Sequence, residues 1–343
     1  MPRNLLLTRK PQRGIAILTV LVMVALVMTL AAVIFARQSQ AVRYQDNYQS
    51  LERAWQYALS LEQFVGMELQ RDAKSNQYDA LNEGWATVLP SLPIEEGSGV
   101  KVGEFSGRLE DLQARYNLNN VINEEGLLRR DQQVALQRVV QAAQLPQGFV
   151  SAISDWVDKN DVILDGEGAE SDYYLSSVIP YRAANMPFSD VSELRLLRLD
   201  LPKEDKTAAL QRLQAMVTTL PAQATVIRVN ANTASAEMLT ALGLSTQQKD
   251  LILSERETEP YETAQDLADK ASLTSEQKLL LGVSSQYFRL QGEVRMGRAR
   301  VHLNSVFFRE RGKPIRVIMR QFQRVDDPKP PAIDDASNTP AKP

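Results

Sequence analysis

An uninterrupted stretch without proline or glycine, from Ile15 to Val65, most restricts how this chain can fold. Its first part, 15–36, carries no charge. As a helix this part would extend about 33 Å, enough to cross a membrane and too long for the apolar region of an ordinary signal peptide. It follows four basic residues, Arg3, Arg9, Lys10 and Arg13. The sequence therefore predicts a single-pass anchor with a cytoplasmic N-terminus and most of the chain across the membrane.

The second half of this stretch has the pattern of an amphipathic helix. Apolar residues recur at spacings of three, four and seven, at Tyr44, Tyr48, Leu51, Trp55, Ala58 and Val65. Because nothing breaks the run, we expect one continuous helix, apolar all round at first and one-sided later, rather than two separate helices.

The composition excludes several classes of function. The absence of cysteine rules out thiolate zinc sites, iron–sulfur clusters, thiol catalysis and disulfides, and the single histidine, His302, rules out His-rich metal centres. Lys and Arg total 39 against 42 Asp and Glu, which does not fit a generic nucleic-acid binder. The sequence shows no motif that pairs a nucleophile with a base. We therefore predict that the protein is not an enzyme and has no catalytic residues and no small-molecule substrate.

The remaining sequence predicts a small sheet interrupted by a helical region. Residues 117–283 have helical patterns, with helices expected at Asp131–Ala143, Val191–Leu199, Lys203–Leu220, Ser235–Leu242, Thr246–Arg256 and Ala264–Lys270. Alternation of period two marks four strands, Val100–Leu109, Tyr287–Val294, Arg298–Phe308 and Ile315–Phe322. The expected fold class is α+β: a long N-terminal helix packed on a small antiparallel sheet, which a large all-α domain interrupts.

Two short motifs recur within the helical region. Asn-x-Asn occurs at Asn117/Asn119 and at Asn230/Asn232, and a Pro-aromatic pair follows at Pro187-Phe188 and at Pro260-Tyr261. This pattern predicts two related helical units, the first with about 40 extra residues. Because the motifs are short, chance similarity is the alternative.

The extra residues contain a strongly acidic segment. Residues 155–172 hold seven carboxylates and one lysine, together with Asn160 and two glycines. Hard oxygen ligands on a bendable loop suit calcium, although the spacing is not that of an EF-hand. A solvated acidic loop without a metal is the alternative.

Several of these motifs resemble those of the K-type pseudopilins of type II secretion, the general secretion protein K family. At the N-terminus, Arg13-Gly14 before the apolar run resembles the cleavage site of the type IV pilin class. The acidic segment and its surroundings are similar to the family signature in Asp155-Trp156-Val157-Asp158-x-Asn160, Gly168-Ala169-Glu170-x-x-Tyr173-Tyr174 and Pro180-Tyr181-Arg182-Ala-Ala-Asn185.

The resemblance implies a minor pseudopilin at the tip of the pseudopilus, which supports export of folded proteins across the outer membrane. A prepilin peptidase would cut between Gly14 and Ile15, and the new N-terminus would be methylated. The fifth mature residue would be Thr19, where most of the class has Glu. The implied location is the inner membrane of a Gram-negative cell, with most of the chain in the periplasm. The implied partners are the I-type and J-type pseudopilins, with the H type as a further candidate.

The resemblance also implies a structural calcium ion in the acidic loop. Asp158, Asn160, Asp165 and Glu170 are the preferred ligands, and Asp161, Glu167 and Asp172 are second choices. The expected division of the chain is a leader (1–14), a transmembrane half-helix (15–36), the first pilin-like part (37–116), the inserted domain (117–284), the closing strands (285–325) and a disordered tail (326–343).

Two other functions compete with this interpretation. Asn230 to Arg256 resembles a helix-hairpin-helix of membrane-anchored DNA receptors, but residues 230–285 carry nine acids and four bases, which would repel a phosphate backbone. A periplasmic hydrolase with a two-metal carboxylate site is the second alternative.

Overall fold

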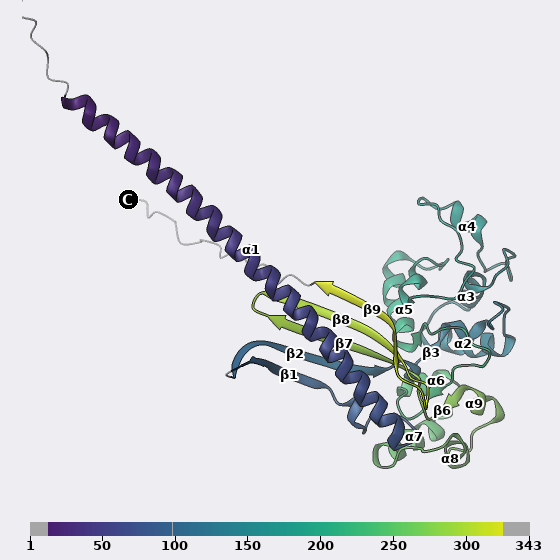
Figure 1. Cartoon of the computed structure of the whole chain (residues 1–343). Coiled ribbons are helices and arrows are strands. Elements are labelled where there is room, and N and C mark those ends of the chain that lie inside the picture. The colour runs from purple at the N-terminus through teal and green to yellow at the C-terminus, as the bar shows by residue number, and fades with distance from the viewer. Residues whose placement is uncertain (1–12, 98, 325–343) are drawn as a thin grey trace, which may run out of the picture.

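The structure is a computed structural model that describes residues 13–97 and 99–324. Figure 1 shows two parts: a long helix that crosses one face of a sheet, and a helical insertion at the end of the helix remote from the N-terminus. Most of the predicted leader (1–14) and the whole predicted tail (326–343) lie outside the described residues.

The helix α1 (Arg13–Ser75) is continuous over 63 residues. Its first half contains a window that is long and apolar enough to span a membrane, and none of that window is buried within the molecule. In its second half, a stripe of residues three or four apart is buried against the sheet: Ala54, Ala58, Leu61, Val65 and Leu69. The helix ends beyond the predicted Val65 because Gly66 faces the ring of Phe307 and Leu69 still packs on the sheet.

The sheet has five antiparallel strands in the order β1-β2-β7-β8-β9. Their bounds are β1 Leu89–Glu96, β2 Val100–Asp111, β7 Tyr287–Met296, β8 Ala299–Phe308 and β9 Arg316–Arg324. Strand β1 was not predicted because Pro90 and Pro93 interrupt its pattern, and an edge strand tolerates such prolines. Strands β2 and β7 pair directly although the whole insertion lies between Asp111 and Tyr287, so the insertion interrupts the sheet only in sequence.

Short helices make up most of the insertion. They are α2 Arg130–Ala142, α3 Phe149–Val157, α4 Ser171–Leu175, α5 Lys203–Met216, α6 Ala236–Ala241, α7 Thr246–Thr258, α8 Ala264–Lys270 and α9 Ser275–Leu280. The 3-10 turns are η1 Gly84–Ala86 before β1, η2 Leu112–Ala114, η3 Leu118–Val121 and η4 Val191–Arg195. The predicted fold class is confirmed, although the helix predicted at 191–199 is only the short turn η4.

Two short parallel strand pairs lie inside the insertion. Strand β3 (Tyr116–Asn117) pairs with β4 (Val217–Thr218), and β5 (Val229–Asn230) pairs with β6 (Leu281–Gly282). The helix predicted at 203–220 therefore stops at Met216, because the next two residues join β3.

The two Asn-x-Asn motifs have the same geometry. Asn119 donates from Nδ2 to the carbonyl of Phe188 (2.9 Å) and accepts from its N–H at Oδ1 (2.8 Å). Asn232 forms the equivalent pair with Tyr261, at 2.9 and 3.0 Å. In each motif the first Asn is the last residue of a short strand, and the second Asn binds the Pro-aromatic segment of its own unit. The structure therefore supports two related units rather than chance similarity.

We predict that Asn119→Ala and Asn232→Ala each lower the free energy of unfolding by about 2–4 kcal/mol. Each substitution leaves a buried N–H and a buried carbonyl without their partner, at about 1–3 kcal/mol per group. Urea unfolding in detergent micelles, followed by circular dichroism, measures the loss. Asn123→Ala is the matched control, because Asn123 accepts a hydrogen bond from the N–H of Leu127 in an exposed turn. This substitution should lower the free energy of unfolding by less than about 1 kcal/mol. A loss at Asn119 no larger than that at Asn123 would contradict this account.

Candidate functional site

The acidic segment forms the loop between α3 and α4, at the upper right of Figure 1. Every residue of α3 is buried, so Asp155 lies inside the domain, and Asp158 directly ends the helix. Because these two residues are three apart, they lie on the same side of the helix end. Glu170 precedes α4 from the other side of the loop. The exposed fractions of Asp155, Asp158 and Glu170 are 0, 2 and 3%.

Four buried oxygens at this loop have no hydrogen-bond donor. They are Asp155 Oδ2, both carboxylate oxygens of Glu170, and Asn185 Oδ1. The other oxygen of Asp155 accepts from the N–H of Leu164 (3.1 Å). Buried carboxylates without donors or a counter-charge are strongly unfavourable, so the protein alone leaves this group of oxygens unsatisfied.

Raised pKa values in the loop also indicate that its buried carboxylates lack a counter-charge. Burial, together with the charges of Asp155, Asp158 and Asp161, raises the pKa of Glu170 to about 8. Burial raises the pKa of Asp155 to about 6, and it also raises the pKa of Asp158. Among the described residues, no lysine or arginine forms an ion pair with Asp155, Asp158 or Glu170. A bound cation would supply the missing charge.

The remaining predicted ligands divide into two groups. Asp161 accepts from the N–H of Ser171 (3.3 Å), and Asn160 accepts a hydrogen bond from Asn185 at its carbonyl (3.2 Å), so both lie beside the unsatisfied oxygens. Asp165 has a partner of its own: it accepts from the hydroxyl of Ser151 (2.7 Å), which lowers its pKa. Its charge nevertheless contributes to the raised pKa of Asp155.

Glu167 and Asp172 also lie apart from this group. Both side chains are exposed, and Glu167 lies against Gly148, at the start of α3. The structure therefore places Asp158, Asn160 and Asp161 near the unsatisfied oxygens of Asp155 and Glu170. Among the described residues, however, no three carboxylates of this loop have oxygens within 4.8 Å of one another.

Sequence reasoning missed two residues of the site, Asp155 and Asn185. The signal for Asp155 was its place one helical turn before Asp158. Asn185 lies beyond α4 in the sequence, and only the fold places it against Asn160.

Aromatic packing and one arginine hold the loop in place. Trp156 packs edge-on against Tyr174, and Tyr174 stacks on Tyr181, with ring centroids 5.3 and 5.2 Å apart. Arg198 lies over the ring of Tyr173 and donates to the carbonyl of Gly168 (3.0 Å). These side chains frame the loop and do not contribute ligands.

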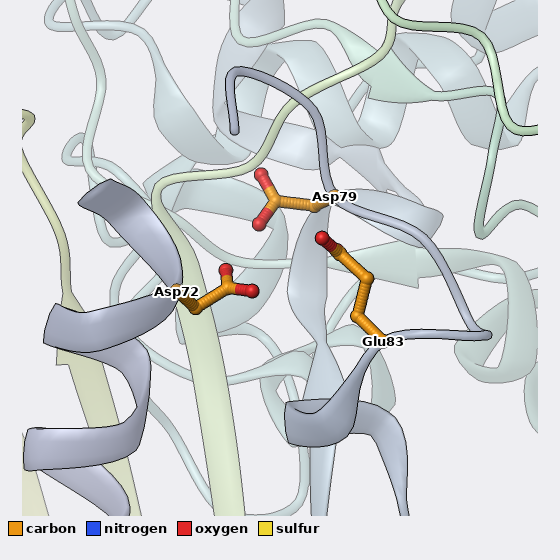
Figure 2. Close-up of side chains that lie close together, drawn as sticks. All are labelled: Asp72, Asp79 and Glu83. Atoms are coloured by element: carbon orange, nitrogen blue, oxygen red, sulfur yellow. The ribbon is translucent and has the colours of Figure 1, made fainter. Parts of the chain in front are cut away.

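A second group of carboxylates lies where α1 meets the sheet and the insertion. Figure 2 shows Asp72, Asp79 and Glu83 turned toward one another. Each has a carboxylate oxygen within 4.8 Å of one on each of the other two, and no other group of three described residues meets this criterion. Unlike the buried carboxylates of the acidic loop, these three carboxylates have hydrogen-bond donors within the protein. Arg309 donates to Asp72 and Asp79, and Glu83 accepts from Trp85 Nε1 (2.9 Å). The guanidinium of Arg309 supplies positive charge to Asp72 and Asp79.

Comparisons with known proteins agree with the motifs. Family models described as type II secretion system protein K match residues 114–222 and 229–284, which correspond to the two related units of the insertion. Protein K of Pseudomonas aeruginosa is 31% identical over 92% of this chain and 94% of its own length. Protein K of Pectobacterium carotovorum is 28% identical over 92% of this chain and 97% of its own length.

A solved structure has the same fold. A chain from the GspK-GspI-GspJ complex of enterotoxigenic Escherichia coli superposes with a TM-score of 0.67 and 23% identity, over 82% of this chain and 99% of that chain. The match supports the long helix, the antiparallel sheet and the helical insertion as one architecture.

We predict that Glu170→Gln stabilises the metal-free protein at high pH. The folded-state pKa of Glu170 lies above the ordinary 4.5, so the folded protein retains a proton that the unfolded chain releases. The stability that this group contributes is therefore lost as the pH rises from about 4.5 to about 8. In EGTA at pH 8, the variant should melt about 2 °C or more above wild type, with little difference at pH 4.5. Thermal melts of wild type, Glu170→Gln and the exposed control Glu124→Gln test this; a lower melting temperature for Glu170→Gln at pH 8 would contradict it.

Proposed function

Since this chain belongs to the family of type II secretion system protein K, a family of pseudopilins, we propose that it is a minor pseudopilin that caps the tip of the pseudopilus. In that position it supports export of folded proteins across the outer membrane. The observation that carries the proposal is the insertion, which lies at the end of α1 remote from the apolar half (Figure 1). In a fibre of side-by-side helices, a bulky domain beyond the helix end leaves no room for a further subunit.

The first half of α1 supplies the anchor and the contact surface. Its apolar window is exposed over its whole length, so lipid or neighbouring helices must cover it. We place the N-terminus in the cytoplasm, the window in the inner membrane, and the sheet and insertion in the periplasm, because basic residues precede the window.

Processing by a prepilin peptidase follows from the same proposal. Cleavage between Gly14 and Ile15, in the first turn of α1, would make Thr19 the fifth residue of a methylated mature chain. A threonine cannot neutralise the terminal amine of a neighbouring subunit as a carboxylate can. This substitution suits a subunit that ends the fibre.

The partners that we propose are the I-type and J-type pseudopilins. The similar solved chain comes from a complex whose description contains GspI and GspJ. Side-by-side packing of the N-terminal helices would bring the three chains together, and an H-type subunit would continue the fibre below them. The role is structural rather than catalytic.

We also propose that calcium binds in the acidic loop. The unsatisfied oxygens of Asp155, Glu170 and Asn185 fit a hard cation, and Asp158, Asn160 and Asp161 can complete the set. Bound calcium would supply positive charge to the loop. Through these ligands it would fix α3, α4 and the segment of Asn185 relative to one another.

The alternative of a DNA receptor has no support. Residues 229–284 match a type II secretion protein K model, and they include the α6–α7 hairpin that resembled a DNA-binding motif. The hairpin turn has one glycine, Gly243, and the surrounding residues 230–285 carry five more acids than bases.

Calcium should raise the thermal stability of the wild-type chain. With free calcium at about 100 times its dissociation constant, the gain is about 2.7 kcal/mol relative to EGTA. Asp158→Ala and Glu170→Ala should lose most of this response, and Glu124→Ala, outside the loop, should keep it. A wild-type melt that is the same in calcium and in EGTA would refute the calcium proposal.

The tip position predicts gold label at one end of each pseudopilus. The chain has no cysteine, so Val178→Cys, at a fully exposed position of the insertion, gives a single labelling site. Pseudopili from cells that make this variant are labelled with maleimide gold and viewed by electron microscopy, with the cysteine-free chain as control. Label along the length of the fibre would overturn the tip assignment.

A further inference from the structure

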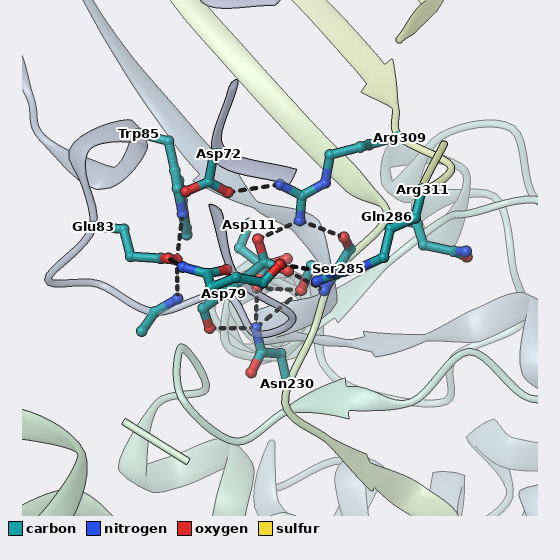
Figure 3. Close-up of polar contacts among 12 residues, drawn as sticks. Asp72, Asp79, Glu83, Trp85, Asp111, Asn230, Ser285, Gln286, Arg309 and Arg311 are labelled. Carbon is teal, nitrogen blue, oxygen red and sulfur yellow. Dashed lines mark hydrogen bonds and ion pairs between the residues drawn. The ribbon is translucent and has the colours of Figure 1, made fainter. Parts of the chain in front are cut away.

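A buried polar junction fastens the insertion to the pilin-like part. Figure 3 shows its side chains converging from the end of α1, the loop after it, the ends of β2 and β8, and the second unit of the insertion. We call this group the polar junction; its members are Asp72, Asp79, Glu83, Asp111, Asn230, Ser285 and Arg309. Asp79, Asp111, Asn230, Ser285 and Arg309 are all at most 3% exposed.

Arg309 and Asp79 form the centre of the junction. Arg309 donates to Asp79, to Asp72 (2.8 Å) and to the carbonyl of Ser285 (2.9 Å), and it lies over the ring of Phe288. Asp79 accepts from the N–H of Ser285 (2.6 Å), and its own N–H donates to the carbonyl of Val283 (2.9 Å). One arginine thus connects α1, the sheet and the segment that leaves the insertion.

Asp111 holds the other side of the junction. Its Oδ2 accepts from the hydroxyls of Ser285 (2.7 Å) and Thr233 (2.6 Å) and from Asn230 Nδ2 (3.1 Å). Its Oδ1 accepts from the N–H of Gln113 (2.8 Å). All four donors are neutral, so the carboxylate is buried without a cation of its own.

The charges at the junction do not balance. Four carboxylates, Asp72, Asp79, Glu83 and Asp111, face one guanidinium, Arg309. Among the other groups nearby, Tyr78 is neutral, and Arg311 donates to the carbonyl of Asn76 (2.6 Å) rather than to a carboxylate. Protonation of a carboxyl group would relieve the excess negative charge without removing a side chain from the network.

We propose that the polar junction is a proton-sensitive joint, which holds the insertion on α1 and the sheet more firmly when Asp72 and Asp111 are protonated than when they are ionised. The Asp72 side chain is 13% exposed, which gives protons a path to the junction. At Asp111, a proton on Oδ2 can be donated to the hydroxyl oxygen of Thr233, 2.6 Å away. Thr233 then donates to the carbonyl of Asn230, 3.3 Å away, while Ser285 still donates to Oδ2. The network of contacts is therefore kept in both states, but the charge is not.

The direction of the effect follows from the buried environment. Burial, with Glu83 adding, raises the pKa of Asp72 to about 6, and burial raises the pKa of Asp111 to about 6, with Asp79 adding. A closed joint thus binds protons more tightly than an open one, in which both groups return to about 3.8. Opening becomes more favourable as the pH rises from about 4 to about 6 and changes little above that. Between pH 5 and 7.5, each group should increase the opening equilibrium by about tenfold.

Hydrogen exchange on the full chain in lipid nanodiscs tests this joint. Protection factors of the amides of Gln113, Ser285 and Gln286, corrected for the intrinsic exchange rate, are compared at pH 5 and 7.5 with calcium constant. The amides of α5, which packs within the first unit of the insertion, are the internal reference. Wild type should show at least tenfold less protection at pH 7.5 at the junction and little change in α5.

Two variants separate a proton-sensitive joint from a merely structural one. Asp72→Asn keeps an acceptor for Arg309 and removes the titration. It should therefore reduce the ratio of the junction's protection factors at pH 5 and pH 7.5 by about tenfold, as should Asp111→Asn. Glu68→Gln, on the exposed pair Glu68–Arg71 of α1, should leave the ratio as in wild type. Equal protection of the wild-type junction at both pH values, or an unchanged ratio in Asp72→Asn, would overturn the proposal. The Asp72 variant decides the question even if Asp111→Asn does not fold.

Discussion

One continuous helix that must satisfy two environments is the constraint on which the rest of the structure depends. The first half of α1 is apolar on all sides and finds no cover within the molecule, while the second half buries one stripe against the sheet. That packing is reinforced by a buried charge: Glu62, 4% exposed, accepts two hydrogen bonds from Arg320 on β9 and one from Ser305 on β8. The sheet is therefore fastened along the helix, and the insertion is carried at its far end.

Much of this architecture could be predicted from local patterns. The uninterrupted run from Ile15 and the period-two strands near the C-terminus each follow from side-chain periodicity, and the structure has both. The Asn-x-Asn repeats also carried real information, because each amide forms the same bidentate pair with its own Pro-aromatic segment. Strand β1 could not be predicted in this way: its two prolines are acceptable only because it lies at the edge.

The candidate metal site was predictable by region and only partly by residue. The seven carboxylates between Asp155 and Asp172 identified the loop, but composition could not show which of them would be buried without donors. Asp165 has its own partner in Ser151, whereas one oxygen of Asp155 and both oxygens of Glu170 have no donor. Asn185 is brought in by the fold. Only Asn230 of the polar junction belongs to a motif visible in the sequence. The other members are scattered along the chain, and only the pairing of distant segments assembles them.

The central claim is that this chain is processed and assembled as a pseudopilin, and its mature N-terminus tests that claim most directly. The full chain is expressed with and without a prepilin peptidase, and the first residue is determined by mass spectrometry. The account predicts a peptidase-dependent start at Ile15 with a methylated amine. An uncleaved chain under both conditions, or a start at Arg37 as after an ordinary signal peptide, would contradict it.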